Sequence, residues 1–590
     1  GAGVGELRRK PACVISERAD PFVCCPGRMG RGGAGVGGAV GNEIAVEGVD
    51  AVAEPLVHKK VHSPKEVTEM RIAKHFVLLV YPFRHSLSGK EGSKRLERLN
   101  GRWFHWWRRL DERSLERALD DTYFFLPYIR SLLFPETALL PKGDASQQVG
   151  KAKELSTLPI SQLAKEIHPD GVLRLTLAPE LMETLRPLQL RMERKNERGE
   201  VVEHFEASLQ LHWIDVALFP QNVGFLVLKV QMDKDKPDVR RLNDLLWYIR
   251  LVLPPTVGWQ LADWQCQGVN GALLFKSRDL VDFLLQGLTD EAQRIDPTME
   301  AFLERLSSGK SVNRYSASEM GQVYGQTFRL YTYACLDEDL GEQNPSSATQ
   351  TVIASPFLSS FQRVLYELAT CTDTNDPNYV PHPEGLTKLM QTSHIGLWEN
   401  WEGMALHDNV VFLGKRPNNF LLNAFAHNVE SDYFHLYLLT LYQKIRLSLL
   451  AGELLRHAKD LHRNLKEARA LWDAFIMFVN HYWFAEVSFK PQGNELYRKF
   501  QRGLGALPLY ESVGQEVRDL QEYYERKAER RISTLLNFLT FVGLPASLLI
   551  DLFSNALLKE ASWLQFGLTT LVFYSVVGVA WVLWSRFGKE

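Results

Sequence analysis

A line of polar side chains within an apolar C-terminal stretch is the arrangement in this sequence that could act on an ion. At helical spacing, one face of the stretch carries Ser533, Asn537, Thr540, Leu544, Ser547 and Asp551. Polar groups at membrane depth must face water or a partner helix, because hydrocarbon leaves their hydrogen bonds unsatisfied. The stripe therefore predicts a pore lining, with hydrogen bonding between packed helices as the alternative. Asp551 favours the pore, since an acid near the end of a span usually marks an ion path.

Two uncharged stretches would place this stripe in a membrane. Residues 532–550 and 561–585 contain no charged residue, and a helix of about 20 apolar residues spans a bilayer. We therefore expect a transmembrane hairpin with helices over 532–552 and 564–584. Four basic residues form a collar before the first helix: Arg526, Lys527, Arg530 and Arg531. By the positive-inside rule both termini are then cytoplasmic, and the chain is predicted to be an integral protein of the cell (inner) membrane.

This layout resembles the CorA-type magnesium and cobalt channel superfamily. The matching residues are Pro545 in the first stretch, Phe553 and Asn555 at its outer end, and Gly567 at the start of the second. Phe553-Ser554-Asn555 stands in place of the family's aromatic-Gly-Met-Asn signature, so this chain lacks the glycine and the methionine.

The resemblance implies an oligomeric channel in a lipid bilayer. It would be a homo-oligomer, which is a pentamer in that family, and its cytoplasmic domain would gate it. A divalent cation such as Mg²⁺ would be the permeant ion, with no tightly bound cofactor. The outer mouth would consist of Phe553, Ser554, Asn555 and Glu560. No residues can be assigned to a resident metal site.

A run of tryptophans and arginines at 102–109 is a second set of residues that could bind a ligand. Arg102, Trp103, Trp106 and Arg109 could form a ligand surface that stacks on a nucleobase or holds a phosphate. The alternative is a core-packed segment with arginine stems lying over it. A ligand surface would favour a different function, that of a CorA-like membrane effector gated by a small molecule or a nucleotide, as in antiviral defence signalling. A membrane-anchored adaptor without an ion path is a third hypothesis.

The common catalytic signatures are absent from the sequence. It contains no His-Glu-x-x-His, no phosphate-binding Gly-x-x-x-x-Gly-Lys-[Ser/Thr], no Gly-x-Ser-x-Gly and no Cys-x-x-Cys. His407-Asp408 could form an acid–base pair, although a turn before a strand explains these residues better. We therefore predict that the protein is not an enzyme.

Composition excludes several other classes. The 590 residues carry 68 Lys and Arg against 70 Asp and Glu, a formal net charge of −2. A nucleic-acid scaffold needs a strongly basic balance, so no nucleic-acid partner is expected. With 45% hydrophobic residues, the chain can bury a large core.

The expected fold is an α/β cytoplasmic domain, then long helices, then the C-terminal two-helix transmembrane hairpin. Residues 1–69 are a Gly-rich leader that we expect to be disordered. Translation could start at Met29 or at Met70. The α/β domain covers 70–345, a loop-rich connector with short strands covers 346–428, long helices cover 429–531, and the membrane hairpin covers 532–585. Alternating apolar residues over 206–213 and 225–232, separated by Pro220-Gln221-Asn222, predict a β-hairpin. One continuous helix is expected from about 515 to about 552.

Overall fold

The chain divides into two compact units, Gly1–Ser63 and Pro64–Glu590. The computed structural model describes residues 70–85, 87, 89–167, 170–195, 201–233, 237–250, 263–268, 271–289, 327–337, 359–461, 465–554, 567–568, 571–572, 575 and 578. All of them belong to the second unit. The predicted leader over 1–69 lies outside the described residues.

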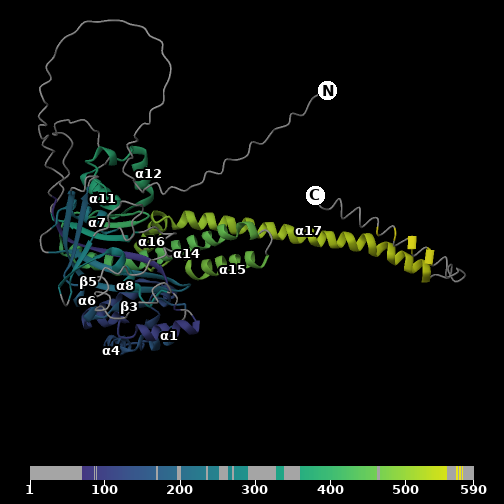
Figure 1. The fold of residues 1–590 in the computed structure, drawn as a ribbon, viewed down its shortest axis with the longest axis horizontal. Helices are drawn as coiled ribbons and strands as arrows, with labels where there is room; N and C mark the ends of the chain where they lie inside the picture. Colours follow the sequence, from purple (N-terminus) through teal and green to yellow (C-terminus); the bar gives the residue numbers. More distant parts are fainter. Residues whose placement is uncertain are drawn as a thin grey trace, which may run out of the picture. The chain divides into compact units, whose positions relative to one another are not determined.

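A mixed sheet of 12 strands forms the centre of the described part, with the strand order β10-β11-β12-β9-β1-β6-β5-β4-β7-β8 (Figure 1). Strands β2 and β3 branch from β5 through β3. The strands are β1 (Ile72–Arg84), β2 (Trp103–His105), β3 (Leu173–Leu177), β4 (Leu188–Lys195), β5 (Val201–Phe219), β6 (Val223–Met232), β7 (Asp263–Gly268), β8 (Gly271–Lys276), β9 (Arg329–Leu336), β10 (His394–Trp398), β11 (Trp401–Ala405) and β12 (Asn409–Gly414). Strands β9 and β12 pair in parallel, and the other pairs are antiparallel. The three short strands of the predicted connector thus belong to this sheet, next to β9.

The centre of the sheet is apolar on both faces because β1 lies between β9 and β6. Successive side chains of a strand point to opposite faces. In β1, Phe76 and Leu78 accordingly enter one hydrophobic core, while Val77 and Leu79 enter a second core on the opposite face. A continuous apolar run is typical of such a strand, buried on both faces.

The predicted hairpin over 206–232 is confirmed. Strands β5 and β6 pair antiparallel from Leu209 opposite Met232 to Phe219 opposite Val223. The turn between them contains Gln221 and Asn222 in the left-handed region, with φ of 58° and 66°. Asparagine tolerates that region better than most residues, whereas glutamine there is unusual.

Helices cover both faces of the sheet. They are α1 (Gly89–Leu99), α2 (Glu112–Asp121), α3 (Pro127–Leu133), α4 (Ala145–Thr157), α5 (Ile160–Glu166), α6 (Pro179–Thr184), α7 (Val239–Ile249), α8 (Ser277–Leu285), α11 (Ser360–Thr370), α12 (Pro383–Ser393), α13 (Ala426–Glu430), α14 (Asp432–Leu461), α15 (Leu465–Tyr482), α16 (Pro491–Gly503) and α17 (Ala506–Ser554). Apolar residues of α14, α15, α16 and the first turns of α17 share one core, whereas those of α1, α7, α8 and α11 belong to the other.

The helix expected from about 515 to about 552 is confirmed as part of α17, which spans 49 residues. Val513 and Val517, one helical turn apart, are buried where α17 contacts α14 and α15. Figure 1 shows this first part of α17 alongside α14, α15 and α16. Farther along, Leu535, Leu536 and Leu539 are exposed.

The predicted transmembrane hairpin is wrong. Over the part of the chain that the structure describes, no helix combines the length and the apolarity that a membrane crossing requires. The stretch 532–552 is instead the last part of α17, where Ser533, Asn537 and Thr540 are exposed among the apolar residues. Most of the second expected span, 564–584, lies outside the described residues. The integral membrane localisation, and the channel assignment that depended on the hairpin, are corrected with it.

Candidate ligand cavity

The polar stripe and the collar are placed along α17. Ser533, Asn537, Thr540 and Ser547 are exposed on this helix. Backbone positions of Leu544, Asp551, Phe553 and Ser554 are helical, while Asn555 and Glu560 lie outside the described residues. In the collar, Arg526 donates to Glu522 at 2.7 Å, one turn earlier, and the Lys527 ammonium lies 5.6 Å from the ring centroid of Tyr523. Arg530 and Arg531 are exposed.

The four residues of the predicted ligand surface lie on both sides of the sheet. Trp103 is fully buried in one core, and Trp106 is buried in the other. Arg102 donates to Gln286 Oε1 at 3.1 Å and stacks on Phe283, 4.3 Å from the ring centroid. The structure therefore does not bring these four side chains to one common surface.

Arg109 belongs to a buried charge cluster between the sheet and α14. Its guanidinium contacts Asp215 at 3.1 Å, and Arg174 lies 3.7 Å from the same carboxylate. Arg174 also stacks over Trp106 at 4.1 Å and hydrogen-bonds His435 of α14. Burial, together with the neighbouring Arg174, holds the pKa of His435 well below its usual value. The cluster attaches α14 to strands β3 and β5.

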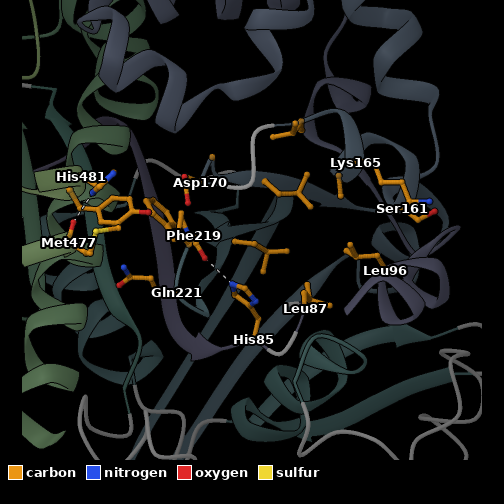
Figure 2. A pocket seen from close by; sticks show the side chains of 17 residues that line it. His85, Leu87, Leu96, Ser161, Lys165, Asp170, Phe219, Gln221, Met477 and His481 are labelled. Carbon is orange, nitrogen blue, oxygen red and sulfur yellow. Dashed lines mark hydrogen bonds between the residues drawn. The ribbon is translucent and has the colours of Figure 1, made fainter. Parts of the chain in front are cut away.

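A separate cavity of about 480 Å³ lies where β1, α5, the β5–β6 turn and α15 meet. Figure 2 shows Met477 and His481 toward one end, Ser161 and Lys165 toward the other, and His85 between the two ends. Its lining residues are His85, Leu87, Leu96, Ser161, Ala164, Lys165, Ile167, Asp170, Gly171, Leu173, Leu218, Phe219, Pro220, Gln221, Met477, His481 and Tyr482. This volume falls within the range of small-molecule sites, roughly 300–1,000 Å³.

The β5–β6 turn fixes His85 at the wall of the cavity. The backbone N–H of His85 donates to Asn222 O at 3.0 Å, and its ring Nε2 pairs with Phe219 O at 2.9 Å. A carbonyl can only accept, so Nε2 carries the proton and Nδ1 of the neutral ring is an acceptor. This Nδ1 is buried and has no hydrogen-bond partner within the described part of the chain. Burial also lowers the pKa of His85, which keeps the ring neutral.

Helix α15 lines one end of the cavity. His481 Nδ1 pairs with Met477 O at 2.9 Å, one turn earlier on the helix, so its Nε2 is not used by that bond. Burial, with Asp170 nearby, raises the pKa of Tyr482 to about 12, and its hydroxyl therefore remains protonated at neutral pH. At the other end of the cavity, Lys165 provides an exposed ammonium group.

Taken together, these groups suit an organic molecule with both apolar and polar parts. Leu96, Leu173 and Leu218 offer apolar contacts, Phe219 offers an aromatic ring, and His85 offers a buried acceptor. Such a pairing of an apolar lining with a few placed polar groups is usual for ligand pockets. Among the residues that the structure describes, no group of three or more His, Cys, Asp or Glu side chains could hold a metal ion.

Sequence reasoning did not identify this cavity. The residues that line it range from His85 to Tyr482, and no motif joins them. The one local signal was Pro220-Gln221-Asn222, which predicts a turn but not the ligand site beside it.

Comparison with known proteins finds no family model that matches the chain and no curated protein that matches its sequence. The resemblance to the CorA-type superfamily therefore stays a prediction. So do the predicted oligomer, its permeant divalent cation and the absence of enzymatic activity.

Proposed function

We propose that this protein is a small-molecule receptor whose ligand occupies the cavity beside His85. The observation that carries the proposal is the cavity itself, whose walls come from the sheet, from α5 and from α15. Its volume of about 480 Å³ is large enough for a small organic molecule, since such sites measure roughly 300–1,000 Å³.

The position of His85 supports the same function. An acceptor that is buried without a partner costs about 1–3 kcal/mol. A ligand that reaches Nδ1 and donates an N–H or O–H to it would relieve that cost. The β5–β6 turn holds His85 in place, because Asn222 O accepts a hydrogen bond from the His85 backbone N–H at 3.0 Å.

This proposal keeps the small-molecule part of the second hypothesis from the sequence and omits its membrane part. The ligand class it favours is an amphipathic organic molecule with a hydrogen-bond donor for His85. An anionic group would be complemented by Lys165 at the rim. Nucleotides satisfy both conditions, and aromatic carboxylates with a donor group do as well.

The test is a thermal-shift screen of the full chain against nucleosides, nucleotides, amino acids and aromatic carboxylates. A ligand that binds only the folded state at 100 times its Kd stabilises it by about 2.7 kcal/mol. The variant Ala164→Trp fills the cavity, and Gln162→Trp adds the same ring to the exposed part of α5 as a matched control. We expect at least one compound to raise the Tm of the wild type and of Gln162→Trp but not of Ala164→Trp. A screen without stabilising compounds, or stabilisation that persists in Ala164→Trp, would contradict the proposal.

A further inference from the structure

The cavity shares one of its walls with the contact surface of α17. Helix α15 presents Met477 and His481 to the cavity. Phe475 lies two residues before Met477, which places it about 200° around the helix. That ring is buried against α17, where a Cβ added at Gly514 would lie 3.4 Å from Phe475 Cζ. One helix thus contacts the ligand space on one side and α17 on the other.

An aromatic stack joins the end of α15 to α17. The rings of Trp483 and Tyr510 are nearly parallel, at 8°, with their centroids 4.2 Å apart. Phe475 stacks on the same Tyr510 at 6.0 Å and 24°. Tyr510 lies in the second turn of α17 and contacts two rings, that of Phe475 in α15 and that of Trp483 directly after it. Stacked aromatic pairs contribute about 0.5–1.5 kcal/mol beyond the area that they bury.

The cavity wall also reaches α14 through aromatic contacts. Phe219, beside the cavity, stacks on Tyr442 of α14 with centroids 4.8 Å apart, and Tyr442 meets Tyr482 edge-on at 5.3 Å. Gln443 donates to Tyr482 O at 2.5 Å. These contacts join the C-terminal end of α15 to α14, which the charge cluster attaches to the sheet. A displacement of α15 relative to α14 is expected to act on Tyr510, which stacks on Trp483 directly after α15.

We propose that α15 transmits occupancy of the cavity to α17 through the stack of Trp483 and Tyr510. The inference concerns the regulation of the proposed ligand site and rests on that function. Its physical basis is that tightly packed contacts change between discrete arrangements rather than deforming continuously. A ligand pressing on Met477 and His481 shifts α15, and Tyr510 follows because its ring stacks on Trp483 and on Phe475.

The test measures amide hydrogen exchange in the full chain, without any ligand. Ala164→Trp fills the cavity directly, and Ser161→Trp fills it from a second lining position if the first variant does not fold. Gln162→Trp is again the control on the same helix. We expect the filled variants to change exchange rates by about threefold or more both in α15 and in residues 506–517 of α17. Gln162→Trp should change neither segment.

A second substitution separates the effect of the Trp483–Tyr510 stack from that of other contacts between α15 and α17. Tyr510→Ala, placed in the filled variant, should leave the change in α15 but remove the change in α17. Tyr523→Ala is the matched control, an exposed tyrosine farther along the same helix. The inference is overturned by a filled cavity that alters α15 without altering α17, by one that alters neither helix, or by an α17 response that survives Tyr510→Ala. None of these outcomes depends on finding a ligand, so they leave the thermal-shift test of binding unaffected.

Discussion

At the scale of single residues, His85 connects the backbone of the sheet to the cavity. Its ring nitrogen Nε2 satisfies Phe219 O, its backbone N–H satisfies Asn222 O, and its Nδ1 remains unpartnered within the described part of the chain. The bonds made by Nε2 and by the backbone N–H hold the turn. Nδ1 is the atom that we assign to the ligand. His85 therefore has a structural role in the turn and a binding role in the cavity.

The variant His85→Leu tests the structural role. The change removes the donor to Phe219 O in a buried environment, and the orphaned carbonyl should lower the free energy of unfolding by about 1–3 kcal/mol. Urea denaturation measures this loss. His481→Leu is the control, because the exposed His481 ring pairs with a carbonyl of its own helix, Met477 O, and surface changes usually stay within about 0.5 kcal/mol. Equal losses in the two variants would contradict the role assigned to His85.

A second residue-scale prediction concerns Asp432, at the start of α14. Burial and the neighbouring Asp121 raise the pKa of this carboxyl group to about 8, although Lys490 and Arg117 oppose the shift. Because the folded state holds the proton more tightly than the unfolded state, stability falls as pH rises toward 8. Buried histidines such as His75, with a pKa of about 4, make stability rise with pH, but only below about pH 6.5.

The effect of Asp432 on stability can therefore be measured between about pH 6.5 and 8. Over this range, the wild type should lose about 1–2 kcal/mol of unfolding free energy through Asp432. Asp432→Asn should remove that loss, since the amide does not titrate. Urea titrations at several pH values measure the slope, and an unchanged slope in the variant would contradict the assignment.

At the scale of elements, close backbone approaches fix where helices contact the sheet. A Cβ on Gly503, at the end of α16, would lie 2.2 Å from Ala405 O of β11 and 2.8 Å from Ala405 Cβ. Helix and strand can approach this closely only because the side chain is absent. Gly452 in α14 has open space at the corresponding position.

We expect substitution by alanine to have opposite effects on stability at Gly503 and at Gly452. Gly503→Ala should destabilise the protein by about 2 kcal/mol or more, because it forces α16 away from β11. Gly452→Ala should stabilise it by about 0.5–1 kcal/mol through helix propensity. Thermal unfolding of the two variants measures both signs. A neutral Gly503→Ala would contradict the packing of α16 on the sheet.

The attachment of α14 to the sheet depends on Asp215. Asp215→Ala leaves the buried Arg174 and the half-buried Arg109 without the carboxylate that they share, and the expected loss is about 3–5 kcal/mol. Glu112→Ala is the control, since it breaks an exposed pair with Lys153 and should leave the unfolding midpoint unchanged. Denaturant unfolding compares the two, and a small loss for Asp215→Ala would contradict this account of the cluster.

Some elements could be predicted from the sequence because their signal is local. Alternation over 206–232 identifies the β5–β6 hairpin, and the spacing of Val513 and Val517 identifies a helix there, although α17 begins earlier, at Ala506. The cavity could not be predicted, since His85, Lys165 and His481 come from segments far apart in the chain. In segment 102–109 the structure agrees with the core-packed alternative, since Trp103, Trp106 and Trp107 are buried. The composition of this segment fits a ligand surface, but the pairing of β2 with β3 places Trp103 and Trp106 in different cores.

At the scale of the whole molecule, helices α14 to α17 share one core with the sheet domain, and α15 alone among them lines the candidate site. The predicted hairpin was inferred from the absence of charge, yet the described part of α17 does not reach the apolarity of a membrane span. The cavity instead lies between the sheet domain and α15, where occupancy would be sensed by both. The central claim is therefore binding of a small molecule at this junction.

The most direct test of that claim is hydrogen exchange with and without the most stabilising compound from the thermal screen. Binding at the cavity predicts slower exchange in the β5–β6 turn around Gln221, in α5 and in the last turns of α15. The same compound should leave the Ala164→Trp variant unchanged. Protection confined to other segments, or equal protection in Ala164→Trp, would contradict the account.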